Sequence, residues 1–168
     1  MEEENIIIRR VGKDDVDAFR HIRLEALCLE PASFASTFED WHALPSEVWQ
    51  QRLNEPVFIA FQSEYPVGLI GLLREKGARS AHRATIVMVY LRKNLRGRGI
   101  ARELFSAIEK FARDIGVRQL ELTVSAENSV AISFYQREGF VEVGRVPGAY
   151  IHEGREIDDV LMVRRLVL

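Results

Sequence analysis

Apolar and polar positions alternate with two different periods along the chain, and the changes of period divide the sequence into strands and helices. Short apolar runs bounded by polar or turn-forming residues predict strands at 5–10, 57–62, 67–74, 83–91, 117–124, 140–146 and 156–166. Helical spacing predicts helices at 14–29, 45–53, 99–115 and 129–137, and a short helix within the loop 31–44. This order, without an internal repeat or a linker, is typical of one mixed α/β domain.

The helix predicted at 99–115 has the most regular pattern. Its apolar residues share one face, because they recur at helical spacing, and they are Ile100, Leu104, Ile108, Phe111 and Ile115. Gly116 follows, as is typical of a helix C-terminus. The strand predicted at 83–91 is almost continuously apolar, which indicates a strand in the middle of a sheet that is covered on both sides.

Length and composition indicate a single globular domain over residues 1–168, with 47% hydrophobic residues. Cys28 is the only cysteine, so no disulfide forms within the chain, which fits a reducing compartment. We expect Cys28 to pack as a small apolar residue. The acidic start MEEEN does not resemble a secretory signal, and no apolar run reaches the ~20 residues that span a bilayer. We therefore expect a cytoplasmic protein without a membrane segment.

Charge is distributed unevenly. The net charge of −2 argues against a nucleic-acid-binding protein with a broad basic surface. Five basic residues nevertheless fall within eleven positions without an acidic residue among them: Arg92, Lys93, Arg96, Arg98 and Arg102. This cluster is either a solvated basic face or a binding site for a phosphorylated ligand.

The stretch NLRGRGIARELF, residues 94–105, places two glycines at the start of the helix predicted at 99–115. The first N–H groups of a helix have no partner within it and attract anions. Glycines let the backbone approach a phosphate closely, and arginines add charge-assisted hydrogen bonds. The pattern predicts a diphosphate site, although a helix start without a ligand has the same composition. Ile100 and Ala101 exclude a P-loop, and Arg102 stands where a dinucleotide motif needs a third glycine.

Two motifs in this chain resemble the GNAT superfamily of N-acyltransferases, which use acetyl-coenzyme A. The first motif is Arg/Gln-x-x-Gly-x-Gly/Ala at the start of a long helix after the central strand, and residues 96–101 (RGRGIA) match it. The second is an apolar strand, an asparagine, a helix with Phe-Tyr and then Gly-Phe, and residues 122–140 (LTVSAENSVAISFYQREGF) match it. The order of elements agrees as well, so the resemblance covers essentially the whole chain.

The resemblance implies a twisted, mostly antiparallel sheet that is splayed in the middle and flanked by helices, with acetyl-CoA in the gap. It implies that strand residues Val89, Tyr90 and Leu91 pair with the pantetheine arm, and that Asn128 contacts the cofactor. It also implies that backbone N–H groups hold the diphosphate, and these belong to Arg96, Gly97, Arg98, Gly99, Ile100, Ala101 and Arg102. Members of the superfamily often pair, so we expect a homodimer.

The implied reaction transfers an acyl group directly from CoA to an amine. Tyr135 is the predicted catalytic residue, because its reference pKa of ~10 exceeds that of thiols and suits a donor to the departing thiolate. A core aromatic residue is the alternative role for Tyr135. No metal is expected, because Asp158 and Asp159 lack convergent partners.

The general base and the acceptor pocket are less defined. Many members carry a glutamate on the central strand, but residues 83–91 contain no carboxylate. A water chain or one of Glu25, His42 and His152 is expected to remove the proton. The acceptor pocket is expected from Phe34, Phe38, Trp41 and the Tyr150–Asp159 loop, with Glu25 as a further substrate-binding residue. Acidic residues of that loop suit a cationic amine or form a solvated turn: Glu153, Glu156, Asp158 and Asp159.

The predicted activity is acetyl transfer to a primary amine of a small molecule, an amino acid or a peptide N-terminus. A non-catalytic acyl-CoA-binding module on the same fold is the alternative.

Overall fold

A single sheet carries all strands of the computed structural model, which describes residues 5–167; the acidic positions 1–4 lie outside the described residues. Within that range seven strands lie in the order β1-β2-β3-β4-β5-β7-β6. Their bounds are β1 Ile6–Arg10, β2 Val57–Gln62, β3 Tyr65–Arg74, β4 Arg83–Leu91, β5 Gln119–Ser125, β6 Val141–His152 and β7 Arg155–Arg165. All neighbouring pairs are antiparallel except β4–β5, which confirms the predicted mixed α/β class.

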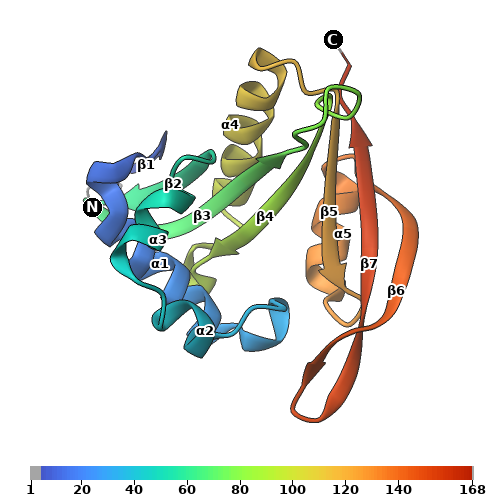
Figure 1. The fold of residues 1–168 in the computed structure, drawn as a ribbon, viewed down its shortest axis with the longest axis horizontal. Coiled ribbons are helices and arrows are strands. Elements are labelled where there is room, and N and C mark those ends of the chain that lie inside the picture. Colours follow the sequence, from blue (N-terminus) through green and yellow to red (C-terminus); the bar gives the residue numbers. More distant parts are fainter. Residues whose placement is uncertain (1–4, 168) are drawn as a thin grey trace.

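Helices cover both faces of the sheet (Figure 1). Their bounds are α1 Val16–Leu29, α2 Phe38–His42, α3 Ser46–Arg52, α4 Ile100–Asp114 and α5 Ser129–Arg137, with 3-10 turns η1 Lys13–Asp15, η2 Pro31–Ser33 and η3 Lys93–Leu95. One buried cluster joins α4 and α5 to the sheet, and a second joins α1, α2 and α3 to the opposite face of β2 and β3. No helix in residues 5–167 has the length and apolar character needed to cross a bilayer.

The sheet opens between its two central strands. The parallel strands β4 and β5 are paired from Arg83–Gln119 to Thr85–Glu121. Beyond Thr85 the strands diverge, and α5 lies behind the β5 side of the gap (Figure 1). This confirms the predicted splay and leaves the gap-facing edge of β4 available to a ligand.

A β-bulge interrupts β4 beside the gap. Val87 pairs with Gly71 and Tyr90 pairs with Leu69, so Met88 and Val89 together face one residue of β3. Met88 adopts a positive φ of 59°, which is rare for a residue with a side chain. A bulge leaves one residue out of the hydrogen-bond ladder and redirects its backbone. The apolar pattern of β4 carries no sign of this bulge.

Helix α4 has the predicted buried face and the predicted end. Gly116 adopts a φ of 87°, and the N–H of Val117 donates to the carbonyl of Ala112 at 2.9 Å. This Schellman arrangement satisfies the last carbonyls of the helix.

Three local predictions are wrong. The loop expected between β6 and β7 is mostly strand, because β6 continues to His152 and accommodates Pro147 by a register shift between Val146 and Tyr150. Proline is tolerated there because β6 is an edge strand. Strand β3 starts at Tyr65 rather than Val67. Cys28 is exposed rather than packed, because the buried face of α1 runs through Phe19, Ile22 and Ala26.

Candidate active site

The turn before α4 presents a run of free backbone N–H groups. No backbone carbonyl within residues 5–167 accepts from the N–H groups of Gly97 to Arg102, and the first helical bond runs from Glu103 to Gly99 at 3.1 Å. The N–H of Arg96 already donates to Lys93 at 3.3 Å. The run expected from Arg96 onward therefore begins one residue later, at Gly97.

Two glycines shape this turn. Gly97 and Gly99 have φ values of 77° and 82°, a left-handed conformation that only glycine adopts without a steric penalty. A Cβ at either position would meet nothing within 4 Å, so the outer side of the turn is open. Free donors, an open approach and the positive end of a helix together fit a diphosphate.

The arginines of the turn mainly hold the protein together. The guanidinium of Arg96 donates to the carbonyl of Leu91 at 3.0 Å and to Glu30 at 2.9 Å. Arg102 lies 3.5 Å from Glu138, and Arg98 is exposed. Acidic residues from distant parts of the chain thus neutralise much of the predicted basic cluster. The phosphate site depends more on backbone N–H groups than on arginine side chains.

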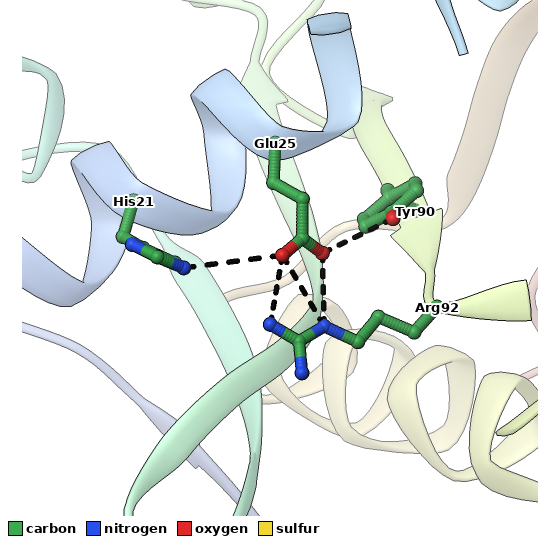
Figure 2. Close-up of polar contacts among 4 residues, drawn as sticks. All are labelled: His21, Glu25, Tyr90 and Arg92. Atoms are coloured by element: carbon green, nitrogen blue, oxygen red, sulfur yellow. Dashed lines mark hydrogen bonds and ion pairs between the residues drawn. The ribbon is translucent and has the colours of Figure 1, made fainter. Parts of the chain in front are cut away.

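Glu25 joins α1 to the strand that leads into the turn (Figure 2). Its carboxylate accepts from the guanidinium of Arg92 at 2.7 Å and from the hydroxyl of Tyr90 at 3.1 Å, and His21 lies 3.9 Å away. Burial favours a raised pKa of Glu25, but hydrogen bonds from Arg92 and Tyr90 and the charges of Arg92 and His21 outweigh it and hold the pKa below its usual range. Burial and the Glu25 charge raise the pKa of Tyr90 to about 12. Glu25 is therefore a poor general base, and we interpret it as a positioning residue.

The three predicted pantetheine contacts lie at the bulge and just beyond it. Val89 belongs to the bulge, and Tyr90 and Leu91 pair again with β3. The carbonyl of Leu91 accepts from Arg96, so it is already engaged. Val89 is the one of the three that lies within the bulge, beyond the last β4–β5 pair at Thr85.

Tyr135 lies on α5 among aromatic rings. Its ring packs against Phe105, Phe134 and Phe140 at centroid distances of 5.8 to 6.2 Å. Burial raises the pKa of Tyr135 above its usual value of 10. A phenol with such a pKa holds its proton against a thiolate, whose reference pKa is about 8.5. The hydroxyl is thus suited to donate a hydrogen bond to the leaving sulfur rather than to give up its proton.

Asn128 caps α5. Its side-chain oxygen accepts from the N–H of Ala131 at 3.1 Å, as in a standard N-cap. This places Asn128 at the junction of β5 and α5 and occupies its carbonyl oxygen. Its amide NH₂ group remains the part suited to a cofactor contact.

Sequence reasoning missed Arg23, which lies among the aromatic residues expected to form the acceptor pocket. Arg23 is 3% exposed, and its guanidinium carbon lies 4.8 Å from the ring centroid of Phe34 and 4.4 Å from that of Trp41. Burial, together with the charge of Arg52, lowers the pKa of Arg23 to about 9. The spacing of Arg23 could have predicted its burial, because it lies four residues from both Phe19 and Leu27 on the apolar face of α1.

Trp41 and Arg23 line a cavity on the α1–α3 side of the sheet. Its volume is about 240 Å³, and its walls come from Arg23, Ser36, Trp41, Arg52, Glu55, Pro56, Val57, Leu72, Leu73, Val87 and Met88. Val87 and Met88 belong to β4, directly before Val89, so the cavity reaches the bulge.

Tyr150, also expected in the acceptor pocket, does not line this cavity. Its hydroxyl donates to the carbonyl of Ala32 at 2.7 Å. That bond ties β6 to η2.

The two histidines expected as bases have surroundings that give them no role in the site. His42 is exposed and stacks on Phe38 at 5.2 Å, and His152 lies at the end of β6 next to the exposed Glu153.

Asp159 is a further acidic residue near the site, and the sequence alone did not indicate it as a base. It pairs with Ser125 at the end of β5, and burial raises its pKa. Val160 and Met162 of β7 pack toward α4 and α5, so Asp159 faces the opposite side, the side of the cavity.

The chain is similar to acetyltransferases in both sequence and structure. Residues 22–140 match the acetyltransferase (GNAT) family. An uncharacterised N-acetyltransferase of Methanocaldococcus jannaschii is 30% identical over 157 residues, which cover 88% of this chain and 68% of that protein. A GNAT-family acetyltransferase structure from Streptococcus pneumoniae superimposes with a TM-score of 0.85 at 23% identity, covering 97% of this chain and 100% of that one. The structure of yncA from Salmonella typhimurium, solved with its cofactor acetyl-CoA, gives a TM-score of 0.79 at 20% identity over 98% and 95% of the two chains.

Proposed function

Because the chain belongs to the acetyltransferase (GNAT) family, we propose that it transfers the acetyl group of acetyl-CoA to a primary amine of a small molecule. The observation that carries this proposal is the run of free N–H groups from Gly97 to Arg102, beside a sheet that opens between β4 and β5. These two features provide a diphosphate cradle and an adjoining slot for an extended arm.

Each proposed role belongs to a group of this chain. Acetyl-CoA supplies an activated acyl group. The backbone N–H groups from Gly97 to Arg102 hold its diphosphate, and the bulged backbone at Val89 donates to the thioester carbonyl, where negative charge develops. The hydroxyl of Tyr135 donates a hydrogen bond to the leaving sulfur.

We propose Asp159 as the group that receives the proton of the acceptor amine. Its raised pKa makes it a stronger base than an ordinary aspartate, and it lies beside the open end of β5, on the face of the sheet opposite to α4 and α5. Asp159 would then replace the glutamate base that the resemblance leads us to expect on the central strand and that β4 lacks. The lowered pKa of Glu25 and its bond to Arg92 disfavour the alternative base.

The test is CoA release from acetyl-CoA across a panel of amines, monitored with a thiol reagent. Acceptor-dependent release at a rate above spontaneous hydrolysis is expected. A protein that binds CoA but accelerates transfer to no amine would support the alternative, a non-catalytic acyl-CoA-binding module.

We also propose that the protein is a cytoplasmic homodimer. The exposed Val141 and Val143 on the edge strand β6 support pairing of two chains. Sedimentation at micromolar protein concentration tests the dimer.

A further inference from the structure

Arg23 is a buried cation, and two of its nitrogen atoms have no hydrogen-bonding partner in the part of the chain that the structure describes. Its Nε and Nη1 atoms are inaccessible to solvent and have no acceptor within residues 5–167. Burying a charged group that lacks hydrogen bonds costs several kcal/mol, so buried cations normally have an anionic partner. No carboxylate of residues 5–167 lies within ion-pair distance of Arg23. The nearby carboxylates of α1 and its C-terminus pair with other residues, Glu25 with Arg92 and His21 and Glu30 with Arg96. An anionic ligand in the cavity that Arg23 lines would supply the hydrogen-bond acceptor that this guanidinium lacks.

Aromatic rings compensate for only part of that cost. The guanidinium of Arg23 lies 4.4 Å from the centroid of Trp41, and the guanidinium of Arg52 lies 4.0 Å from the same ring. Cation–π contacts favour a guanidinium but give its N–H groups no acceptor. The charge of Arg52 also disfavours the charged form of Arg23, and an anion close to both arginines would relieve this repulsion.

The cavity connects these arginines with the expected reaction centre. Arg23, Arg52 and Trp41 form one part of its lining together with Glu55, and Val87 and Met88 of the bulged strand form another. Two guanidinium groups thus face one carboxylate in this lining. At about 240 Å³ the cavity is smaller than the ~300–1,000 Å³ typical of drug-sized ligands. A molecule of roughly amino-acid size would fill it with one end at the arginines and the other at the strand.

We infer that Arg23, assisted by Arg52, binds an anionic oxygen group of the acceptor, so that the acceptor is a small amine that carries its own carboxylate or phosphonate. The planar guanidinium fork matches both groups in a bidentate manner. This inference rests on the proposed acetyltransferase function. It disfavours polyamines and other polycationic acceptors, whose charge would meet two arginines.

Matched acceptors test the inference. Acetyl transfer to the standard α-amino acids is compared with transfer to their carboxamides, and transfer to 2-aminoethylphosphonate is compared with transfer to ethanolamine. We expect the anionic member of a pair to be preferred by roughly 10- to 100-fold in kcat/KM, as for a charged hydrogen bond. Whether the carboxylate or the phosphonate series reacts faster identifies the group.

The decisive variant is Arg23→Met, which keeps an unbranched chain and removes the charge. It should abolish the preference for the anionic acceptor, mainly through KM. Arg23→Lys keeps the charge without the fork and should recover part of the preference. The matched control is Arg20→Met, because Arg20 lies one turn earlier on α1, stacks 5.7 Å from Trp49 and does not line the cavity.

Thermal unfolding separates a binding role from a structural one. A guanidinium kept for an anionic ligand makes the free protein less stable, so Arg23→Met should unfold at the same or a higher temperature than wild type. A clear fall in Tm with unchanged acceptor preference would assign Arg23 to structure and overturn the inference.

A binding measurement keeps the inference independent of turnover. Tryptophan fluorescence is titrated with the same amino acids and carboxamides at constant ionic strength, because Trp41 contacts both arginines. Saturable change with the anionic compounds in wild type but not in Arg23→Met supports the anion site even if no amine is acetylated, in which case the proposed function fails alone. Equal transfer to amino acids and carboxamides, unaltered by Arg23→Met, overturns the inference and leaves the proposed function intact.

Discussion

The carboxylate of Glu25 accepts from the guanidinium of Arg92 at 2.7 Å and thereby ties helix α1 to the end of strand β4 (Figure 2). A second tie joins Glu30 at the end of α1 to Arg96 at 2.9 Å. Both arginines belong to the segment that leads into the free N–H groups at Gly97–Arg102. The acidic residues of α1 therefore hold the proposed phosphate-binding turn in place, although they lie more than sixty residues away in the sequence.

Glu25→Gln should lower the free energy of unfolding by about 1 kcal/mol at neutral pH, a value reduced for the exposure of Arg92. The folded pKa of Glu25 lies below its usual 4.5, so the unfolded chain binds the proton more readily. The contribution is therefore complete above the unfolded pKa and is lost as pH falls through the folded pKa. Urea unfolding of both proteins at pH 7 and at a series of lower pH values measures this, and a difference that does not shrink as pH falls would contradict it.

Gly99→Val should weaken CoA binding by at least about tenfold, because a β-branched residue disfavours the left-handed turn and brings a side chain to the phosphate approach. Gly116→Val is the matched control, since Gly116 has a similar φ of 87° at the opposite end of α4. Both variants carry similar backbone strain, but only the first touches the turn. Calorimetric titration with CoA compares them, and equal affinity in the two variants would remove the phosphate role from Gly99.

Tyr135→Phe should reduce kcat by roughly 100-fold, because it removes a hydrogen-bond donor to the developing thiolate charge, with less than about a twofold change in the affinity for acetyl-CoA. The variant removes one hydroxyl and keeps the ring that packs among Phe105, Phe134 and Phe140. Tyr65→Phe, at a position that is 71% exposed, controls for loss of a tyrosine hydroxyl. Wild-type turnover in Tyr135→Phe would leave Tyr135 with the packing role alone.

Asp159→Asn should reduce kcat by roughly 100-fold and remove the acidic limb of the pH–rate profile. In wild type, activity should rise with pH through the pKa of Asp159, which burial places above the usual 3.8. The neighbouring Asp158 faces away and accepts from the N–H of Gly148 at 2.9 Å, so Asp158→Asn is the control. An acidic limb that survives in Asp159→Asn assigns the base to another group or to water.

Local patterns predicted the regular elements well, because strand and helix periods follow from burial of one face. β4 and α5 begin and end at the predicted residues, Arg83–Leu91 and Ser129–Arg137. The bulge at Met88 was not predictable, because it depends on register against β3 rather than on composition. The continuation of β6 through Pro147 likewise depends on its place at the sheet edge.

The candidate site divides in the same way. The free N–H groups at the start of α4 follow from a glycine-rich helix start, which is a local signal, and the structure bears out their availability from Gly97 onward. Arg23 and Asp159 stand out through their burial, which arises from the packing of distant elements. The partners of Arg92 and Arg96 are long-range as well, so their sequence cluster suggested more free positive charge than the fold retains.

The N–H groups of Gly97–Arg102 test the account most directly, through backbone NMR of the ¹⁵N-labelled protein titrated with CoA. The account predicts that the amide resonances of these residues shift in a saturable manner and that their hydrogen exchange slows when CoA binds. Saturation of the protein with CoA while these resonances and their exchange rates stay unchanged would contradict it.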